Sequence, residues 1–100
     1  MKKLILYITF LYPNEKKFFE ILEVINKKGV DIVEFGIPVS NPIIDGKTIR
    51  DTHAKVLKNG LNKETIERVL KEVRNKFDFE VILMTYKEGI DNYSLLKLDE

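Results

Sequence analysis

The hydrophobic positions of this chain fall into short apolar runs separated by longer segments with a helical period. The runs are residues 3–9, 31–37 and 80–86, and β-branched and aromatic residues are frequent in them. Runs of this length and composition are typical of buried strands. In the second run the apolar residues hardly alternate with polar ones, which indicates burial on both faces and parallel neighbours. We therefore expect three parallel strands.

Two amphipathic helices are predicted between these strands. The first is capped by Asn14 and ends at Gly29. The second is capped by Asn62. In both segments apolar residues recur at a helical spacing with charged residues between them. The two apolar stripes consist of Phe18, Ile21, Leu22 and Ile25 in the first helix and Ile66, Val69, Leu70, Val73 and Phe77 in the second.

The connection after the second strand, residues 38–47, is long, because loops between a strand and a helix commonly have about 2–6 residues. Thr48 and Asp51 resemble a capping box, which predicts a short helix over residues 49–58. Residues 87–92 are polar and predict a turn. A further helix is expected from Asn92 to Leu98.

Alternating strands and helices predict an α/β fold, with a parallel sheet and right-handed crossovers. Residues 1–100 make up one domain at most. The pattern fits the start of a doubly wound sheet or the start of a (β/α)8 barrel. Three parallel strands complete neither, and they leave two exposed edges.

Composition excludes several classes of protein. With 44% hydrophobic and 33% charged residues, the chain is typical of folded globular proteins. It has no cysteine, which excludes disulfides and thiolate chemistry and fits a cytoplasmic protein. Lys and Arg are scattered among Asp and Glu at a net charge of +1, so a nucleic-acid partner is not expected. No apolar run approaches the length of a membrane-spanning helix.

Glu34 and Asp45 are the main candidates for chemistry. Glu34 stands in a strand that is otherwise Ile, Val, Phe and Gly, where an isolated carboxylate is costly and occurs mostly at functional sites. Asp45 ends the loop that follows, and two carboxylates are the minimum for acid/base catalysis. Alternatively, Glu34 pairs with a Lys or Arg for structural reasons, and Asp45-Gly46 is simply a turn.

Other chemical signals are weaker. His53 is expected in the middle of a helix with no base or nucleophile in reach by sequence, so we interpret it as a surface or packed histidine rather than a catalytic one. Tyr86 either lines a site at the end of the third strand or is an amphipathic residue at a strand end. The glycines form no phosphate-binding pattern, and no metal site is expected.

Four segments together resemble one known family. Residues 34–46, Glu-Phe-Gly-Ile-Pro-Val-Ser-Asn-Pro-Ile-Ile-Asp-Gly, resemble the E-L-G-I-P-F-S-D-P-x-A-D-G-P signature of the alpha subunit of tryptophan synthase. Residues 7–9 with Pro13, residues 54–60 and residues 83–86 are similar to the family's Y-I-T-x-G-D-P, R-A-L-K-N-G and L-M-T-Y motifs. The matches occur in order and cover nearly the whole chain.

The resemblance implies a (β/α)8 TIM barrel, of which this chain covers about the first three β/α units. It implies a lyase of tryptophan biosynthesis that cleaves indole-3-glycerol phosphate to indole and glyceraldehyde 3-phosphate. In that reaction Glu34 would protonate C3 of the indole ring, and Asp45 would interact with the indole N–H. The positions that match the family's substrate-binding residues are Tyr7, Ile49, Met84 and Tyr86.

The resemblance also implies a partner. Family members form a heterotetramer with a beta subunit that carries pyridoxal phosphate, and the alpha subunit itself holds no cofactor. The loop positions that correspond to the contact with the beta subunit are Pro38, Asn41 and Pro42. Several residues depart from the family pattern, mostly on this rim: Leu11, Tyr12, Asn41, Lys47, Arg50, Glu88 and Gly89.

The length of this chain bears on whether it is active by itself. A full barrel has roughly 250 residues, and the family's phosphate site lies in its later loops. We therefore expect little activity from these 100 residues alone. The alternatives are a non-catalytic fragment that keeps only a partner-binding surface, and another phosphate-handling barrel lyase. An open three-stranded sheet is also expected to self-associate unless the remaining strands are supplied in trans.

Overall fold

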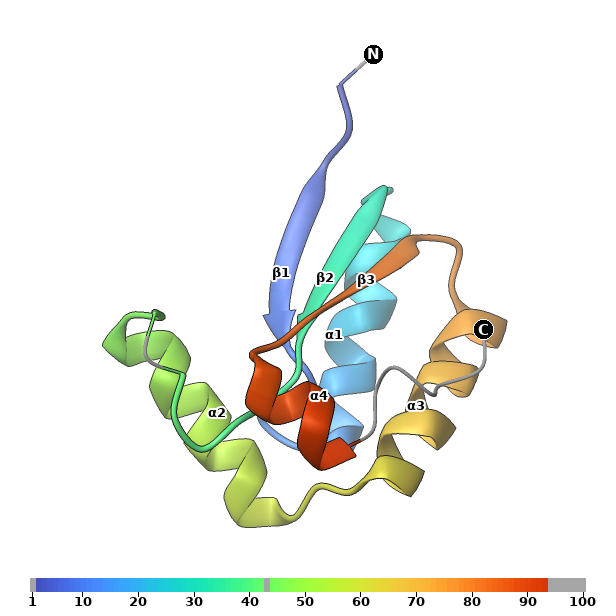
Figure 1. The fold of residues 1–100 in the computed structure, drawn as a ribbon. Helices are drawn as coiled ribbons and strands as arrows, with labels where there is room; N and C mark the ends of the chain where they lie inside the picture. Colours follow the sequence, from blue (N-terminus) through green and yellow to red (C-terminus); the bar gives the residue numbers. More distant parts are fainter. Residues whose placement is uncertain (1, 43, 94–100) are drawn as a thin grey trace.

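Three parallel strands form a single sheet in the order β1-β2-β3 (Figure 1). The computed structural model describes residues 2–42 and 44–93. The elements are β1 (Ile5–Thr9), α1 (Glu15–Lys27), β2 (Ile32–Gly36), α2 (Lys47–Asn59), α3 (Lys63–Lys76), β3 (Glu80–Met84) and α4 (Lys87–Tyr93). The predicted parallel sheet is confirmed, with each strand slightly shorter than its apolar run.

The register of the sheet separates its two faces. Tyr7, Glu34 and Ile82 lie beside one another across the three strands. Because successive side chains in a strand point to opposite faces, Val33 and Phe35 lie on the other face. Val33 and Phe35 are fully buried, whereas Glu34 is partly exposed. We call the Val33/Phe35 side the closed face and the Tyr7/Glu34/Ile82 side the open face.

The hydrophobic core lies between the closed face and helices α1 and α3, which cover it (Figure 1). Three aromatic rings occupy its centre: the ring centroids of Phe18 and Phe35 are 5.2 Å apart, and Phe10 lies 5.5 Å from Phe18 and 5.6 Å from Phe35. Burying one such side chain stabilises a fold by about 1.5–3 kcal/mol. The buried apolar residues of α3 are Ile66, Val69 and Val73.

Side-chain caps fix the start of both core helices, as predicted. The Asn14 side chain accepts a hydrogen bond from the backbone N–H of Lys17 at 3.0 Å. The Asn62 side chain accepts one from Thr65 at 2.8 Å. Each cap satisfies a backbone N–H that has no partner within the helix, and losing one costs about 1 kcal/mol. Local sequence therefore determines where these helices begin.

Two predictions about the other helices are wrong. Helix α2 begins at Lys47, and its N-cap, Gly46, makes no side-chain capping bond, so the capping box of Thr48 does not form. Asp51 instead pairs with Lys47 at 2.9 Å. Residues 87–92 form most of helix α4 rather than a turn. The polar composition misled the prediction, because charged residues spaced by four, such as Lys87 and Asp91 at 2.7 Å, support a helix.

The helix expected from Asn92 to Leu98 lies mostly outside the described residues. Asn92 and Tyr93 belong to the end of α4, and nothing beyond them is described.

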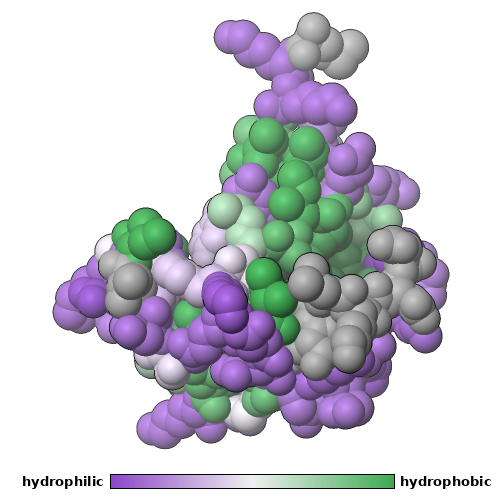
Figure 2. All heavy atoms as spheres, viewed as in Figure 1, coloured by the Kyte–Doolittle hydropathy of each residue, from purple (hydrophilic) through white to green (hydrophobic). Residues whose placement is uncertain are grey.

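The open face exposes apolar side chains from the outer strands. Ile5 is 49% exposed, Ile82 42% and Met84 45%. Figure 2 shows the resulting hydrophobic area over the strands. Exposed apolar residues also occur beside the β1 edge and on α1, namely Leu4, Leu6, Ile21 and Val24. Contiguous apolar surface of this kind marks a place where further protein packs.

Candidate functional site

A cleft of about 240 Å³ lies at the carboxyl end of the sheet. All three strands, the loop before α2, α2 itself and the residues after β3 contribute to its wall. The lining residues are Tyr7, Gly36, Ile44, Asp45, His53, Met84, Thr85 and Tyr86. In β/α barrels the loops at this end of the strands build the active site. The cleft therefore occupies the place where chemistry is expected in such a fold.

Tyr86 holds Asp45 in this cleft. Its hydroxyl donates a hydrogen bond to Oδ2 of Asp45 at 3.0 Å. The phenol oxygen of Tyr86 also accepts hydrogen bonds from the backbone N–H groups of Ile44 at 2.9 Å and of Asp45 at 3.1 Å. One phenol thus fixes both the backbone and the carboxylate at the end of the loop. Among the described residues no donor contacts Oδ1 of Asp45, so that oxygen is available to a ligand.

Glu34 lies on the same open face, in the middle of β2. Its neighbours in register are Tyr7 on β1 and Ile82 on β3. Within the described part of the chain, no hydrogen bond or ion pair reaches its carboxylate. The side chain is partly exposed and not part of the cleft wall. Its expected burial is thus incomplete, because the face on which it stands is open.

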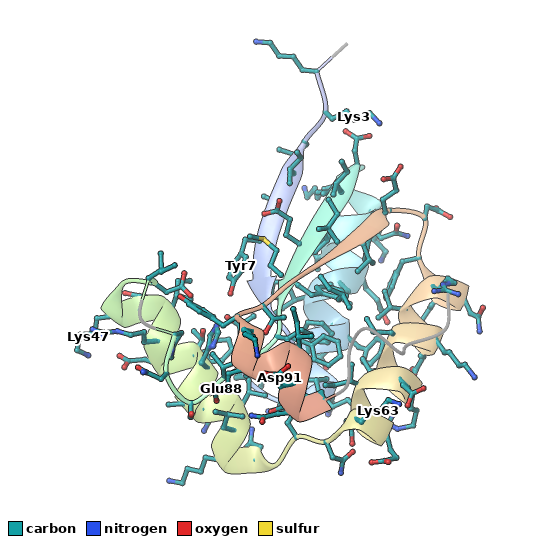
Figure 3. All side chains as sticks on the ribbon, in the orientation of Figure 1. Lys3, Tyr7, Lys47, Lys63, Glu88 and Asp91 are labelled. Atoms are coloured by element: carbon teal, nitrogen blue, oxygen red, sulfur yellow. The ribbon has the colours of Figure 1, made fainter. Side chains whose placement is uncertain are left out.

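Tyr7 closes the other side of the cleft (Figure 3). Its ring lies so close to Gly36 that any Cβ there would collide with the phenol, which explains the glycine at this position. The Tyr7 hydroxyl hydrogen-bonds to Thr9 at 3.5 Å, and Thr9 in turn to Thr52 of α2 at 2.6 Å. Burial raises the pKa of the Tyr7 phenol above its ordinary value. This network attaches α2 to β1.

His53 is a wall residue that the sequence did not identify. Its side chain is buried, as the packed alternative predicted, and Nδ1 accepts the backbone N–H of Val39 at 3.1 Å. Burial lowers the pKa of the imidazole, and the negative charge of Asp45 opposes that shift. No sequence signal placed His53 in the wall, because Ile49, which lies four residues earlier on the same face of α2, does not line the cleft.

A contact between Ser40 and Glu88, which the sequence did not predict, holds the start of the loop between β2 and α2. The backbone N–H and the hydroxyl of Ser40 both donate to Oε2 of Glu88, at 2.9 and 2.7 Å. These hydrogen bonds lower the pKa of the Glu88 carboxyl. Figure 3 shows Glu88 on α4. The sequence registered Glu88 only as a departure from the family pattern.

Only some of the other residues predicted to bind substrate or partner lie in the cleft or at the surface. Met84 lines the cleft together with Tyr7, Asp45 and Tyr86, whereas Ile49 is partly buried outside its wall. Of the three predicted partner-contact residues, Pro38 and Pro42 are buried within the chain and Asn41 is exposed.

Residues 2–42 and 44–93 contain no group of three His, Cys, Asp or Glu side chains that could hold a metal ion. In the same part of the chain, no helix has both the length and the apolar content to cross a membrane.

Comparison with known sequences gives a consistent result. The family model described as the tryptophan synthase alpha chain matches residues 1–98. The tryptophan synthase alpha chain of Petrotoga mobilis is 40% identical over 94 residues, which are 94% of this chain and 36% of that protein. The alpha chain of Dehalococcoides mccartyi is 36% identical over 96% of this chain and 38% of that protein. The chain thus spans little more than a third of these relatives.

Solved structures of the same family resemble this chain as well. The tryptophan synthase complex from Pyrococcus furiosus superimposes with a TM-score of 0.78 at 35% identity, over 89% of this chain and 37% of that chain. The alpha subunit from Legionella pneumophila gives a TM-score of 0.81 at 27% identity, over 90% of this chain and 35% of that chain. The sheet and its helices correspond to the first three β/α units of the (β/α)8 barrel of these proteins. The chain belongs to the tryptophan synthase alpha chain family, a lyase family of tryptophan biosynthesis.

Proposed function

We propose that this chain supplies the acid/base pair of a lyase that cleaves indole-3-glycerol phosphate to indole and glyceraldehyde 3-phosphate. The observation that carries the proposal is the Asp45 carboxylate, which Tyr86 holds in a cleft at the carboxyl end of the sheet. Glu34 stands on the same open face, among largely apolar neighbours. Family membership supports the reaction class.

The proposed mechanism gives each carboxyl group one role. The Glu34 carboxylic acid protonates C3 of the indole ring, and positive charge develops on the ring nitrogen. Asp45, facing the ring N–H, stabilises that charge more in the transition state than in the ground state. The bond between C3 and the side chain then breaks, and its electron pair restores the aromatic ring. The hydroxyl on the departing carbon becomes the aldehyde, and its proton returns to the Glu34 carboxylate.

The side chains around the carboxyl groups are suited to an aromatic ligand. Tyr7 and Met84 present ring and thioether surface in the cleft. Ile49 is proposed as a third contact, reached once a ligand or a further part of the barrel is in place. Aromatic rings pack favourably against such side chains. No group in this mechanism requires a cofactor.

The proposed partner is a beta subunit that carries pyridoxal phosphate. A solved relative from Pyrococcus furiosus is an α2β2 tryptophan synthase complex, which supports the same assembly here. Asn41 is exposed in the loop and is the proposed contact residue. Pro38 and Pro42 would act by shaping that loop, since both are buried within the chain.

A second candidate is a chain that binds partners without catalysis. The exposed apolar side chains of the open face favour it, since they need a cover that the described residues do not provide. The two candidates predict different behaviour when the missing part of the barrel is added. A binding fragment would associate with it and release no indole.

The test is indole release from indole-3-glycerol phosphate, measured for this chain alone and together with the remaining five β/α units of the Petrotoga mobilis relative. We expect little or no indole from the chain alone and clear release from the mixture. Asp45→Asn should lower that release at least tenfold. Asp51→Asn is the matched control, because Asp51 is an exposed carboxylate on α2 that pairs with Lys47. Equal release by both variants would contradict the proposal.

A further inference from the structure

The loop between β2 and α2 is attached at both ends to one short segment, residues 86–88. At the end of the loop, the hydroxyl of Tyr86 contacts the backbone N–H of Asp45 at 3.1 Å and the Asp45 carboxylate at 3.0 Å. At its start, the Glu88 carboxylate accepts the backbone N–H and the hydroxyl of Ser40, at 2.9 and 2.7 Å. Ser40 and Asp45 therefore share one support at the start of α4.

Helix α4 also packs directly on the start of this loop. Gly89 is buried, and a Cβ on it would collide with the side chain of Thr85 and crowd that of Val39. A glycine at this position allows the helix and the loop to approach closely. From the end of the same helix, the phenol of Tyr93 donates to the carbonyl oxygen of Pro38 at 3.4 Å. The place of the loop thus depends on the place of α4.

The Glu88 contact differs in kind from the others that hold the loop. Among the described residues, Glu88 is the only carboxylate that hydrogen-bonds to residues 37–42. Hydrogen bonds to an ionised group are roughly twice as strong as those between neutral groups. The Ser40 hydroxyl and then the Ser40 N–H lower the pKa of the Glu88 carboxyl, which favours the ionised form. The adjacent Lys87 is paired with Asp91 at 2.7 Å, so it does not take the place of Ser40.

We propose that Glu88 is a positioning residue for Asp45. By holding Ser40, Glu88 fixes the start of the loop that brings the Asp45 carboxylate to the cleft, and Tyr86 fixes the end. Glu88 is partly exposed and does not line the cleft, so it acts on the reaction through the loop. The inference rests on the proposed function, because it takes Asp45 as the group that acts on the substrate.

Three variants isolate the Glu88 contact. Glu88→Ala removes the acceptor, and Glu88→Gln keeps an amide oxygen that can accept a hydrogen bond from Ser40. Asp91→Ala is the matched control, because Asp91 is a carboxylate on the same helix that pairs with Lys87 instead of the loop (Figure 3). A loss that comes from weakening α4 as a whole would appear in Asp91→Ala as well.

Combining Glu88→Ala with Asp45→Asn distinguishes positioning from a merely structural role. If Glu88 acts through Asp45, its removal has little left to disturb once the Asp45 charge is gone, so the two losses do not multiply. A structural role that is independent of Asp45 would lower the rate by the same factor in both backgrounds.

The experiment measures indole release from indole-3-glycerol phosphate by each variant, complemented with a saturating amount of the remaining five β/α units so that assembly does not limit the rate. We expect Glu88→Ala to lower kcat roughly threefold to tenfold with KM little changed, because Asp45 is proposed to act mainly in the transition state. In the Asp45→Asn background the same change should cost less than about twofold. Glu88→Gln should recover part of the rate, and Asp91→Ala should stay near the wild type.

Three results would overturn the inference and leave the proposed function standing, given that Asp45→Asn lowers release. One is an unchanged rate in Glu88→Ala. Another is the same factor of loss from Glu88→Ala with and without Asp45→Asn. The third is an equal loss in Asp91→Ala. If the wild-type mixture releases no indole, or if Asp45→Asn does not lower release, the proposed function fails and the inference fails with it.

Discussion

The two faces of the sheet differ in what the chain itself supplies. The closed face is covered by α1 and α3, and its central residues Val33 and Phe35 are fully buried. On the open face, Ile82 and Met84 are more than 40% exposed, and Glu34 stands between them and β1. One side of the same strands therefore stabilises the fold, and the other carries the candidate chemistry. The stabilising core and the candidate site thus lie on opposite faces of a single sheet.

The largest expected effect breaks the closed face. Phe35→Ala removes a fully buried ring that lies within 5.6 Å of the Phe10 and Phe18 rings. We expect a loss of about 3–5 kcal/mol in the free energy of unfolding. Ile82→Ala, on the open face, should cost under about 1 kcal/mol, since Ile82 is already 42% exposed. Urea unfolding followed by circular dichroism compares them, and equal losses would contradict the separation of the two faces.

The next effect concerns the open face and should change activity rather than stability. Tyr86→Phe removes the hydroxyl that contacts Ile44 and Asp45 but keeps the ring. Release of indole by the complemented chain should fall roughly tenfold, which corresponds to about 1.4 kcal/mol of transition-state stabilisation. The melting temperature should change little. Unaltered release would mean that Asp45 needs no support from Tyr86.

A smaller effect depends on pH. Burial lowers the pKa of His53 in the folded chain, so the folded state binds a proton less readily than the unfolded state. Stability that depends on neutral His53 is therefore present above the unfolded pKa of about 6.5, and it is lost as pH falls below that value towards the folded pKa. Protonation also ends the acceptance of the Val39 N–H.

This dependence is measured as the urea midpoint at about pH 7.5 and about pH 5.5, for the wild-type chain and for His53→Asn. The drop between the two pH values should be smaller in the variant, because Asn does not titrate. Equal drops would show that other groups cause the pH dependence.

The smallest effect is a surface ion pair. Arg68 on α3 donates to both carboxylate oxygens of Glu15 on α1, at 2.8 and 2.9 Å. Both side chains are about half exposed, so solvent and salt screen the pair. Arg68→Ala should cost under about 1 kcal/mol, and the difference should shrink in high salt. A cost above that of Ile82→Ala that persists in salt would show that the pair matters more than its exposure suggests.

Sequence reasoning performed best where the cause is local. The caps Asn14 and Asn62 and most of the apolar stripes of α1 and α3 were predicted, because a cap and a helical period depend on neighbouring residues. The stripe of α1 was wrong at Ile21, which is exposed, and it omitted Phe19, which is buried. Helix α4 was missed because polarity alone does not distinguish a turn from an exposed helix. The polar composition of residues 87–92 does not reveal the ion pair between Lys87 and Asp91, which stabilises α4.

The candidate site was predicted only in part, for the same reason. Asp45 and Tyr86 were both named, but their hydrogen bond joins residues 41 positions apart and depends on how β3 lies beside β2. The contacts of His53 with Val39 and of Glu88 with Ser40 are likewise products of tertiary packing. Sequence identifies the groups that can react, and the fold decides which of them share a cleft.

The most direct test of the central claim compares two carboxylates of the open face, Glu34 and Glu80. In register, Glu80 pairs with Ile32, two residues before Glu34, at the opposite end of the sheet from the cleft. Indole release is measured for Glu34→Gln and Glu80→Gln, each complemented with the remaining β/α units. The account predicts that Glu34→Gln abolishes release and that Glu80→Gln leaves it near the wild-type rate. Equal release by the two variants would contradict it.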